Sequence, residues 1–388
     1  MLYQIIGISL CAPLLIASLY RGLSLFSMPV LTSGVWLMVF GTGILLHSKF
    51  YSLTSEVFIA WLIWFSITGY LSFLVTPARS IRVPVSEFRR LPFGYSYLMY
   101  GLIAWLCYEA WVVGTAGPNH FFLNLRLSSN GLEGYESLGV IVNVYPIIFA
   151  LFVFEHIYPS KQNRQTRRLT WVWLLLYAVA TMGKFAVITP VITWLVLRDF
   201  KRKVSWEKLA LIGISASILM LLLHFVRASE DDTISFIGLV GTYVYSPIVA
   251  LGYFDPHQVG QIGPNVFRIF YAIGNRVGLA DDPVDVILEY VYVPNPTNVY
   301  SVLYPFLFDF GLIGVALGGV LYLLIFTPLF YCATHHNRFC QAAYALLSIC
   351  LVAQFISELF LTMISGFVQT ALAISLLFWI SRRGSHAS

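Results

Sequence analysis

A polar interval from about Val226 to Tyr300 holds the side chains of this chain that are best suited to acid and base chemistry. It carries eight of the eighteen acidic residues, three arginines and one histidine. A carboxylate or an imidazole can take the proton of an attacking hydroxyl group. Candidates for that role are Glu230, Asp231, Asp232, Asp255 and His257. We select Asp255, His257 and Glu230, although an Asp before Pro256 also starts a turn, and the residues alone favour the turn.

Four cations could bind an anionic group beside these carboxylates. The guanidinium fork suits phosphate oxygens, and a lysine supplies a compact point charge. For a single arginine near a span end, contact with lipid headgroups or with the acids of the same loop is the simpler interpretation. Taken jointly, Lys184 and Arg227 favour a binding role. The candidates for holding the diphosphate of a lipid carrier are Lys184, Arg227, Arg268 and Arg276.

We expect no metal site and no cofactor. Cys332, His335, His336 and Cys340 have a superficially zinc-like spacing, but a closed ligand set is missing. A divalent cation bound to a diphosphate and held by Asp231 and Asp232 stays open as an alternative. All five cysteines lie in or beside apolar runs, so a disulfide framework is not expected either.

The composition places these residues in a membrane protein. The chain has 388 residues, 59% of them hydrophobic and 11% charged, and a mean hydropathy of +0.79. These values lie outside the range of soluble globular domains. The net charge of +5 does not indicate nucleic acid, because Lys and Arg fall in short clusters between apolar runs, where they set membrane orientation.

The apolar runs predict an all-α polytopic membrane protein with about eleven transmembrane helices and one large outer loop. A span needs roughly 20 mostly apolar residues. We assign residues 1–225 to helices 1–8, residues 226–300 to the loop or cap, and residues 301–388 to helices 9–11. The expected spans are Leu2–Tyr20, Met28–Leu46, Glu56–Thr76, Gly94–Gly114, Leu138–Ile157, Leu169–Met182, Phe185–Leu197, Ala210–Val226, Ser301–Tyr331, Gln341–Ile356 and Leu361–Ile380.

The sixth and seventh runs are short, and we predict that they form a hairpin turning at Gly183 and Lys184. With that turn, seventeen of the 23 basic residues lie on the cytoplasmic side. The polar interval then faces outward. Within it, Thr233–Phe254 is long enough to span, but Pro247 and three glycines favour two short segments that lie in the membrane interface or dip into it. The spacing of apolar residues predicts an amphipathic interfacial helix over Pro264–Val277.

Asp309 is an acid at the start of an apolar run, where a charge is costly. We therefore expect a partner such as Lys184 or an outer arginine. Glu109, His224 and Glu358 fall near outer span ends, where capping or exposure explains them.

Two stretches carry a resemblance to a known family. They are Asn295-Pro296-Thr297-Asn298-Val299-Tyr300, and Tyr304-Pro305 followed by Asp309-Phe310-Gly311-Leu312-Ile313-Gly314. Here the chain resembles the O-antigen or oligosaccharide repeat-unit polymerases of Gram-negative bacteria, the Wzy type. Lys184 at the hairpin turn is also similar to the family, in which Arg is more usual. The motif match covers about Val226 to Gly319.

The resemblance implies a GT-C-like glycosyltransferase of the bacterial inner membrane, active at the periplasmic face in lipopolysaccharide biosynthesis. It would polymerise O-antigen repeat units carried on undecaprenyl diphosphate, without a nucleotide sugar. In that interpretation Asn298, Tyr300 and Asp309 shape the motif region. Membrane lipids and a chain-length regulator protein would be its partners, and nucleic acid would not. The alternatives are an O-antigen ligase, whose acceptor is lipid A core, and, more distantly, a lipid-linked oligosaccharide flippase or another transporter.

Overall fold

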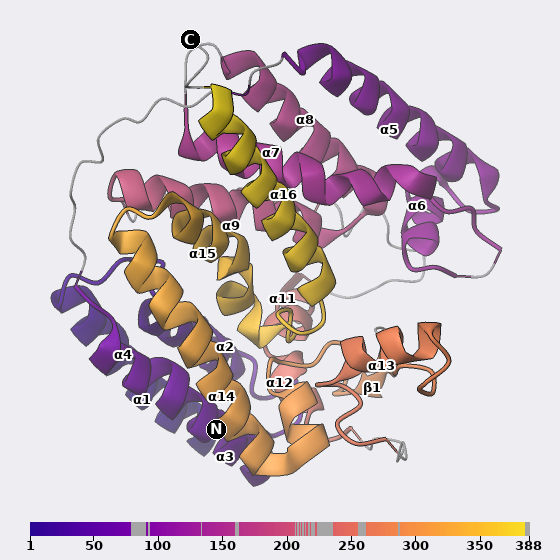
Figure 1. Cartoon of the computed structure of the whole chain (residues 1–388). Helices are drawn as coiled ribbons and strands as arrows, with labels where there is room; N and C mark the ends of the chain where they lie inside the picture. Colours follow the sequence, from indigo (N-terminus) through magenta and orange to yellow (C-terminus); the bar gives the residue numbers. More distant parts are fainter. Residues whose placement is uncertain are drawn as a thin grey trace. The chain divides into compact units, whose positions relative to one another are not determined.

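The computed structural model is mostly helical, with almost no sheet (Figure 1). It describes residues 1–78, 91, 94–132, 134–159, 163–205, 236–254, 261–285 and 288–384, and seven single positions between 207 and 222. The chain forms two compact units. Unit 1 comprises Met1–Ser80, Ile234–His335 and Leu347–Ser365, and unit 2 comprises Ile81–Thr233, His336–Leu346 and Gly366–Ser388.

Eight helical segments of the described chain are long and apolar enough to cross a membrane, which makes this a membrane-embedded protein. Eight of the eleven expected spans correspond to them. They are α1 (Leu2–Tyr20), α2 (Met28–Leu45), α3 with η1 and α4 (Ser55–Val75), α5 (Ser96–Ala116), η2 with α7 (Gly139–Ile157), α14 (Tyr304–Thr334), α15 with η3 (Arg338–Phe355) and the first part of α16 (Ile364–Gly384).

The hairpin helices are not among these eight. They form α8 (Arg164–Thr181) and α9 (Lys184–Lys201), which pack against each other. The turn predicted at Gly183 is confirmed: Met182 ends α8 in the left-handed conformation, with φ of 50°, and Gly183 caps the start of α9. The expected span Ala210–Val226 falls largely outside the described residues.

The core of unit 1 is an aromatic cluster built around the amide of Gln354. Trp36 on α2 and Trp64 on α3 (Ser55–Phe65) each donate an indole N–H to Gln354 Oε1, at 3.3 and 2.9 Å. The amide nitrogen donates to Thr32 Oγ1 and to the Leu351 carbonyl, at 3.0 and 2.9 Å. The oxygen of this buried amide therefore accepts two hydrogen bonds and its nitrogen donates two, as burial of a polar group requires.

The uncharged run Thr233–Phe254 folds as two short segments, as expected, and the break falls before Pro247. They are α11 (Phe236–Val244) and α12 (Ser246–Ala250). All side chains of α12 are buried, and α11 packs on α2. Helix α12 therefore forms part of the core of unit 1. The location of the two segments in or near the membrane interface stays a prediction.

The helix expected over Pro264–Val277 is shorter in the structure, where α13 spans Arg268–Arg276. The residues before it form turns, with Gly263 at φ of 61°. A two-residue antiparallel pair follows, β1 (Val291–Tyr292) and β2 (Pro296–Thr297). The described residues between α13 and β1 contain no further helix or strand.

Unit 2 contains α5, α6 (Phe121–Ser129), η2 (Gly139–Val144), α7 (Tyr145–Ile157), α8 and α9, with parts of α15 and α16. Phe149, Phe152, Phe154 and Trp173 are fully buried in it. Thr193 Oγ1 donates to the Ala345 carbonyl at 3.1 Å, which ties α9 to the first part of α15.

Two cysteines depart from the expectation for this chain. Cys332 and Cys340 are disulfide-bonded, whereas Cys11, Cys107 and Cys350 are free thiols. Disulfides persist in oxidising compartments, while the positive-inside pattern assigns the intervening loop to the cytoplasm. These two observations favour opposite orientations for that loop.

Candidate functional site

The junction between the polar segment and α14 is organised by Asp309. Its carboxylate accepts three hydrogen bonds: from the side-chain amide of Asn265 at 2.7 Å, and from the backbone N–H groups of Asn265 and Val266 at 3.0 and 2.7 Å. Of the outer arginines expected as partners, Arg268 donates to the Val284 carbonyl, and Arg227 lies outside the described residues. Amide donors stabilise this carboxylate.

The two residues after Asp309 complete the junction. Phe310 packs edge-on against Phe267, with ring centroids 5.9 Å apart. Gly311 has φ of 60° and ψ of −149°, a backbone conformation open essentially to glycine alone. At this point α14 bends, so its first turns diverge from its long apolar part (Figure 1). Each residue of the Asp-Phe-Gly run thus has a structural role at one bend.

Tyr300 ends the first motif stretch, Asn295 to Tyr300, inside unit 1. Its ring stacks on Tyr304 at 5.1 Å and meets Phe254 edge-on at 4.9 Å. Its hydroxyl donates to the Glu289 carbonyl at 2.8 Å. Burial raises the pKa of Tyr300, and the neighbouring Tyr304 and Glu289 add to the effect, so the hydroxyl remains a hydrogen-bond donor at neutral pH.

Asn298 lies between β2 and Tyr300 and is half-buried. Its neighbours are fixed by the fold: Thr297 Oγ1 accepts from the Val299 N–H at 3.3 Å, and Asn295 donates to Thr242 Oγ1 at 3.1 Å. Within the part of the chain that the structure covers, the Asn298 amide makes no hydrogen bond. Its amide can therefore still form hydrogen bonds.

The two arginines of α13 have different surroundings. Arg268 is half-buried, and its Nε donates to the Val284 carbonyl at 2.7 Å, whereas Arg276 is exposed. They are eight positions apart on the helix, which is about 12 Å along the axis. Phe270 and Ile273 on the same helix are 68% and 57% exposed. The helix therefore combines cations with an exposed apolar face, which is typical of an interfacial helix.

Lys184 is the first residue of α9 in unit 2 and is half-buried. A cation there lies next to the positive end of a helix dipole, where an anion is favoured. The remaining candidates, Arg227, Glu230, Asp255 and His257, and the pair Asp231 and Asp232, lie outside the described residues.

Three carboxyl groups that are buried in the described part of the chain were not selected from the sequence: Glu155, Asp199 and Glu358. Glu358, expected to be exposed or capping, is 2% exposed; it accepts from the Tyr322 hydroxyl at 2.8 Å and from the N–H groups of residues 360–362. It caps that turn, which is one of the two expected roles, and it does so while buried. Burial raises its pKa, which these hydrogen bonds partly offset. Glu155 on α7 is fully buried beside Tyr95 and Thr170. An acid inside an apolar run was the signal for Glu155.

Among the residues described, no group of three or more His, Cys, Asp or Glu side chains is placed to hold a metal ion. The chain matches no protein-family model, no curated protein and no solved structure. The described structure is that of a helical membrane protein. Asp309 ties its polar segment to the start of an apolar helix.

Proposed function

We propose that this protein is a glycosyltransferase of the bacterial inner membrane that polymerises O-antigen repeat units carried on undecaprenyl diphosphate, at the periplasmic face. The observation that supports it best is the Asp309 junction. The Asp309 carboxylate binds Asn265 and Val266, which lie just before α13. It thereby fixes the polar segment at the start of α14. A helix with exposed Phe270 and a cation at each end is suited to a ligand with a lipid tail and a charged headgroup.

The reaction needs little from the protein beyond positioning and charge. The acceptor hydroxyl oxygen forms a bond to the anomeric carbon of the donor sugar, and the bond from that carbon to the diphosphate oxygen breaks. The electron pair leaves with the lipid diphosphate, whose charge Lys184, Arg227, Arg268 and Arg276 would stabilise. The hydroxyl proton goes to a base, for which Asp255, His257 and Glu230 are the candidates.

Lipopolysaccharide banding after deletion and complementation tests the proposal. Loss of a polymerase leaves a single repeat on the core, loss of a ligase leaves none, and unchanged banding excludes both. Complementation with Arg276→Ala or Lys184→Ala should shorten or abolish the ladder. Arg202→Ala is the matched control, because Arg202 is an exposed arginine that follows α9, at the opposite end of this helix from Lys184. An unchanged ladder in both test variants would remove the diphosphate assignment.

A further inference from the structure

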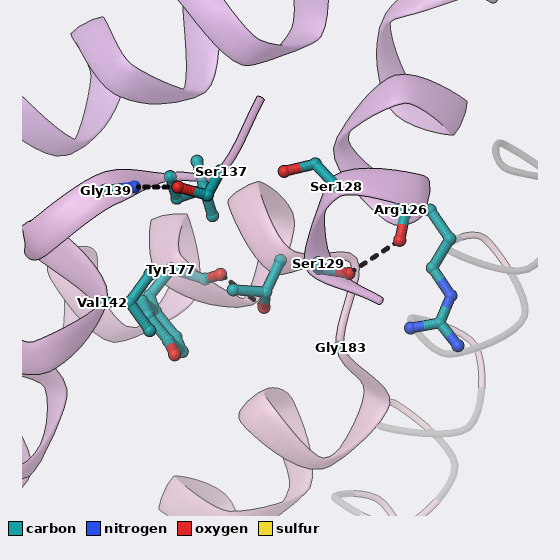
Figure 2. Close-up of a pocket in the computed structure, with 10 residues that line it drawn as sticks. Arg126, Ser128, Ser129, Ser137, Gly139, Val142, Tyr177 and Gly183 are labelled. Atoms are coloured by element: carbon teal, nitrogen blue, oxygen red, sulfur yellow. Dashed lines mark hydrogen bonds between the residues drawn. The ribbon is translucent and has the colours of Figure 1, made fainter. Parts of the chain in front are cut away.

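Unit 2 contains a cavity of about 350 Å³ that the proposed reaction has not used (Figure 2). Its walls come from the end of α6, from the segment that leads into η2, and from the turn between α8 and α9. The volume is at the lower end of the range of small-molecule sites, about 300–1,000 Å³. Its lining residues are Arg126, Ser128, Ser129, Ser137, Leu138, Gly139, Val142, Tyr177, Thr181 and Gly183.

Three of the five hydroxyl groups that line this cavity are set as acceptors. A Ser or Thr hydroxyl has one hydrogen to donate. Ser128 donates it to the Glu136 carbonyl, Ser129 to the Arg126 carbonyl at 2.9 Å, and Thr181 to the Tyr177 carbonyl at 2.8 Å. Their oxygens can therefore only accept a further hydrogen bond from a ligand. Figure 2 shows Ser137 and Tyr177 on one side of the view and Ser129 and Arg126 on the other.

An array of acceptors selects the chemistry of its ligand. A phosphate brings acceptors of its own, so three of these hydroxyls could not bond to it. A cation would bring donors, but the lining holds no carboxylate and includes Arg126. What remains is a neutral molecule with several O–H groups. Leu138, Val142 and the ring of Tyr177 offer an apolar surface for its C–H groups.

We propose that this cavity is a binding site for a neutral sugar residue, with Ser128, Ser129 and Thr181 accepting hydrogen bonds from its hydroxyl groups. The assignment of this sugar to the lipid-linked glycan rests on the proposed function. The sugar site itself rests only on the residues that line the cavity.

Saturation-transfer NMR on the purified full-length protein in detergent tests the site. The probes are glucose, galactose, mannose and rhamnose, with glucosamine and glucuronate at the same concentration. Neutral sugars should give signal, and the two charged sugars should give less. Removing one acceptor hydrogen bond of ordinary strength should weaken binding by about fivefold in Thr181→Val and in Ser129→Ala. Ser137→Trp, which fills the cavity, should abolish it.

Ser375→Ala is the matched control, because that serine also donates to a helix carbonyl, Ala371, but is exposed on α16. Equal binding in wild type and all three cavity variants, or stronger binding of a charged sugar, would overturn the inference. Lipopolysaccharide banding separates the two proposals. Sugar binding lost in the cavity variants, with a deletion strain that still makes a normal ladder, supports the site and refutes the proposed function. A ladder that depends on the protein, with sugar binding unchanged by the variants, refutes the site alone.

Discussion

Asp309→Ala tests whether the Asp-Phe-Gly run anchors the polar segment. The substitution removes three hydrogen bonds to a charged acceptor, which are donated by Asn265 and Val266. Bonds to charged groups contribute about 1.5–3 kcal/mol each. Asp309 is half-buried, so water replaces part of this, and we expect a loss of about 2–4 kcal/mol for the three together.

Trypsin cleavage at Arg268 and Arg276 reports the opening of the anchored segment. When reclosing is fast, the cleavage rate follows the population of the open form. A loss of about 2 kcal/mol then raises the rate roughly 30-fold. Asn265→Ala should raise it less, because the two backbone donors remain. The coupling energy from the double mutant should be about 1–2 kcal/mol, the contribution of the side-chain bond.

Two further variants make the result interpretable. Asp309→Asn keeps the shape but has one acceptor oxygen, so it should fall between wild type and Asp309→Ala. Asp282→Ala removes an exposed carboxylate that accepts one 3.0 Å bond from Asn275 and should change the rate less than threefold. If Asp309→Ala behaves like Asp282→Ala, the anchoring role is refuted.

Three other outcomes are expected. Gln354→Leu should lower the unfolding free energy in detergent by about 2–4 kcal/mol, because Trp36 and Trp64 lose their acceptor. Gln341→Leu, near the start of α15, removes an acceptor for Arg338 and is the milder comparison; equal thermal melting of the two variants would contradict this. Burial raises the pKa of Glu358 above its ordinary value of 4.5, so the folded state holds the proton to a higher pH than the unfolded state does. The unfolding free energy should therefore fall as the pH rises above about 4.5, and Glu358→Gln should lose that pH dependence. Reporters fused at Asp282 and at Asn337 should lie on opposite sides of the membrane, with Asp282 outside. Asp282 in the cytoplasm would invert the proposed orientation, and it would place the disulfide-bonded Cys332 and Cys340 on the oxidising side.

Features fixed by local sequence were predicted well. The α8 and α9 turn follows from two short apolar runs around Gly183, and the end of α11 follows from Pro247. Breakers and hydrophobic period act within a few residues, so no knowledge of distant contacts is needed.

Features fixed by distant contacts were missed. Asn265 and Asp309 are 44 residues apart, and their bonds hold a turn where the periodicity predicted the start of a helix. Glu358 near an outer span end was expected to cap or to be exposed; it caps, but its burial against Tyr322, 36 residues away, was not predicted. Nothing in the local pattern specifies either partner, which is how tertiary contacts override propensity.

The geometry of Asp309 also narrows the search for the catalytic base. A carboxylate has about four acceptor positions, and here three are used by amide donors fixed within the fold. A general base needs an oxygen within hydrogen-bond reach of the attacking hydroxyl. Asp309 is thus better suited to holding the junction than to accepting a proton. If the proposed reaction is correct, its base belongs to the polar interval that this junction fixes, and Asn298, whose amide stays open, is the motif residue best placed to contact the glycan.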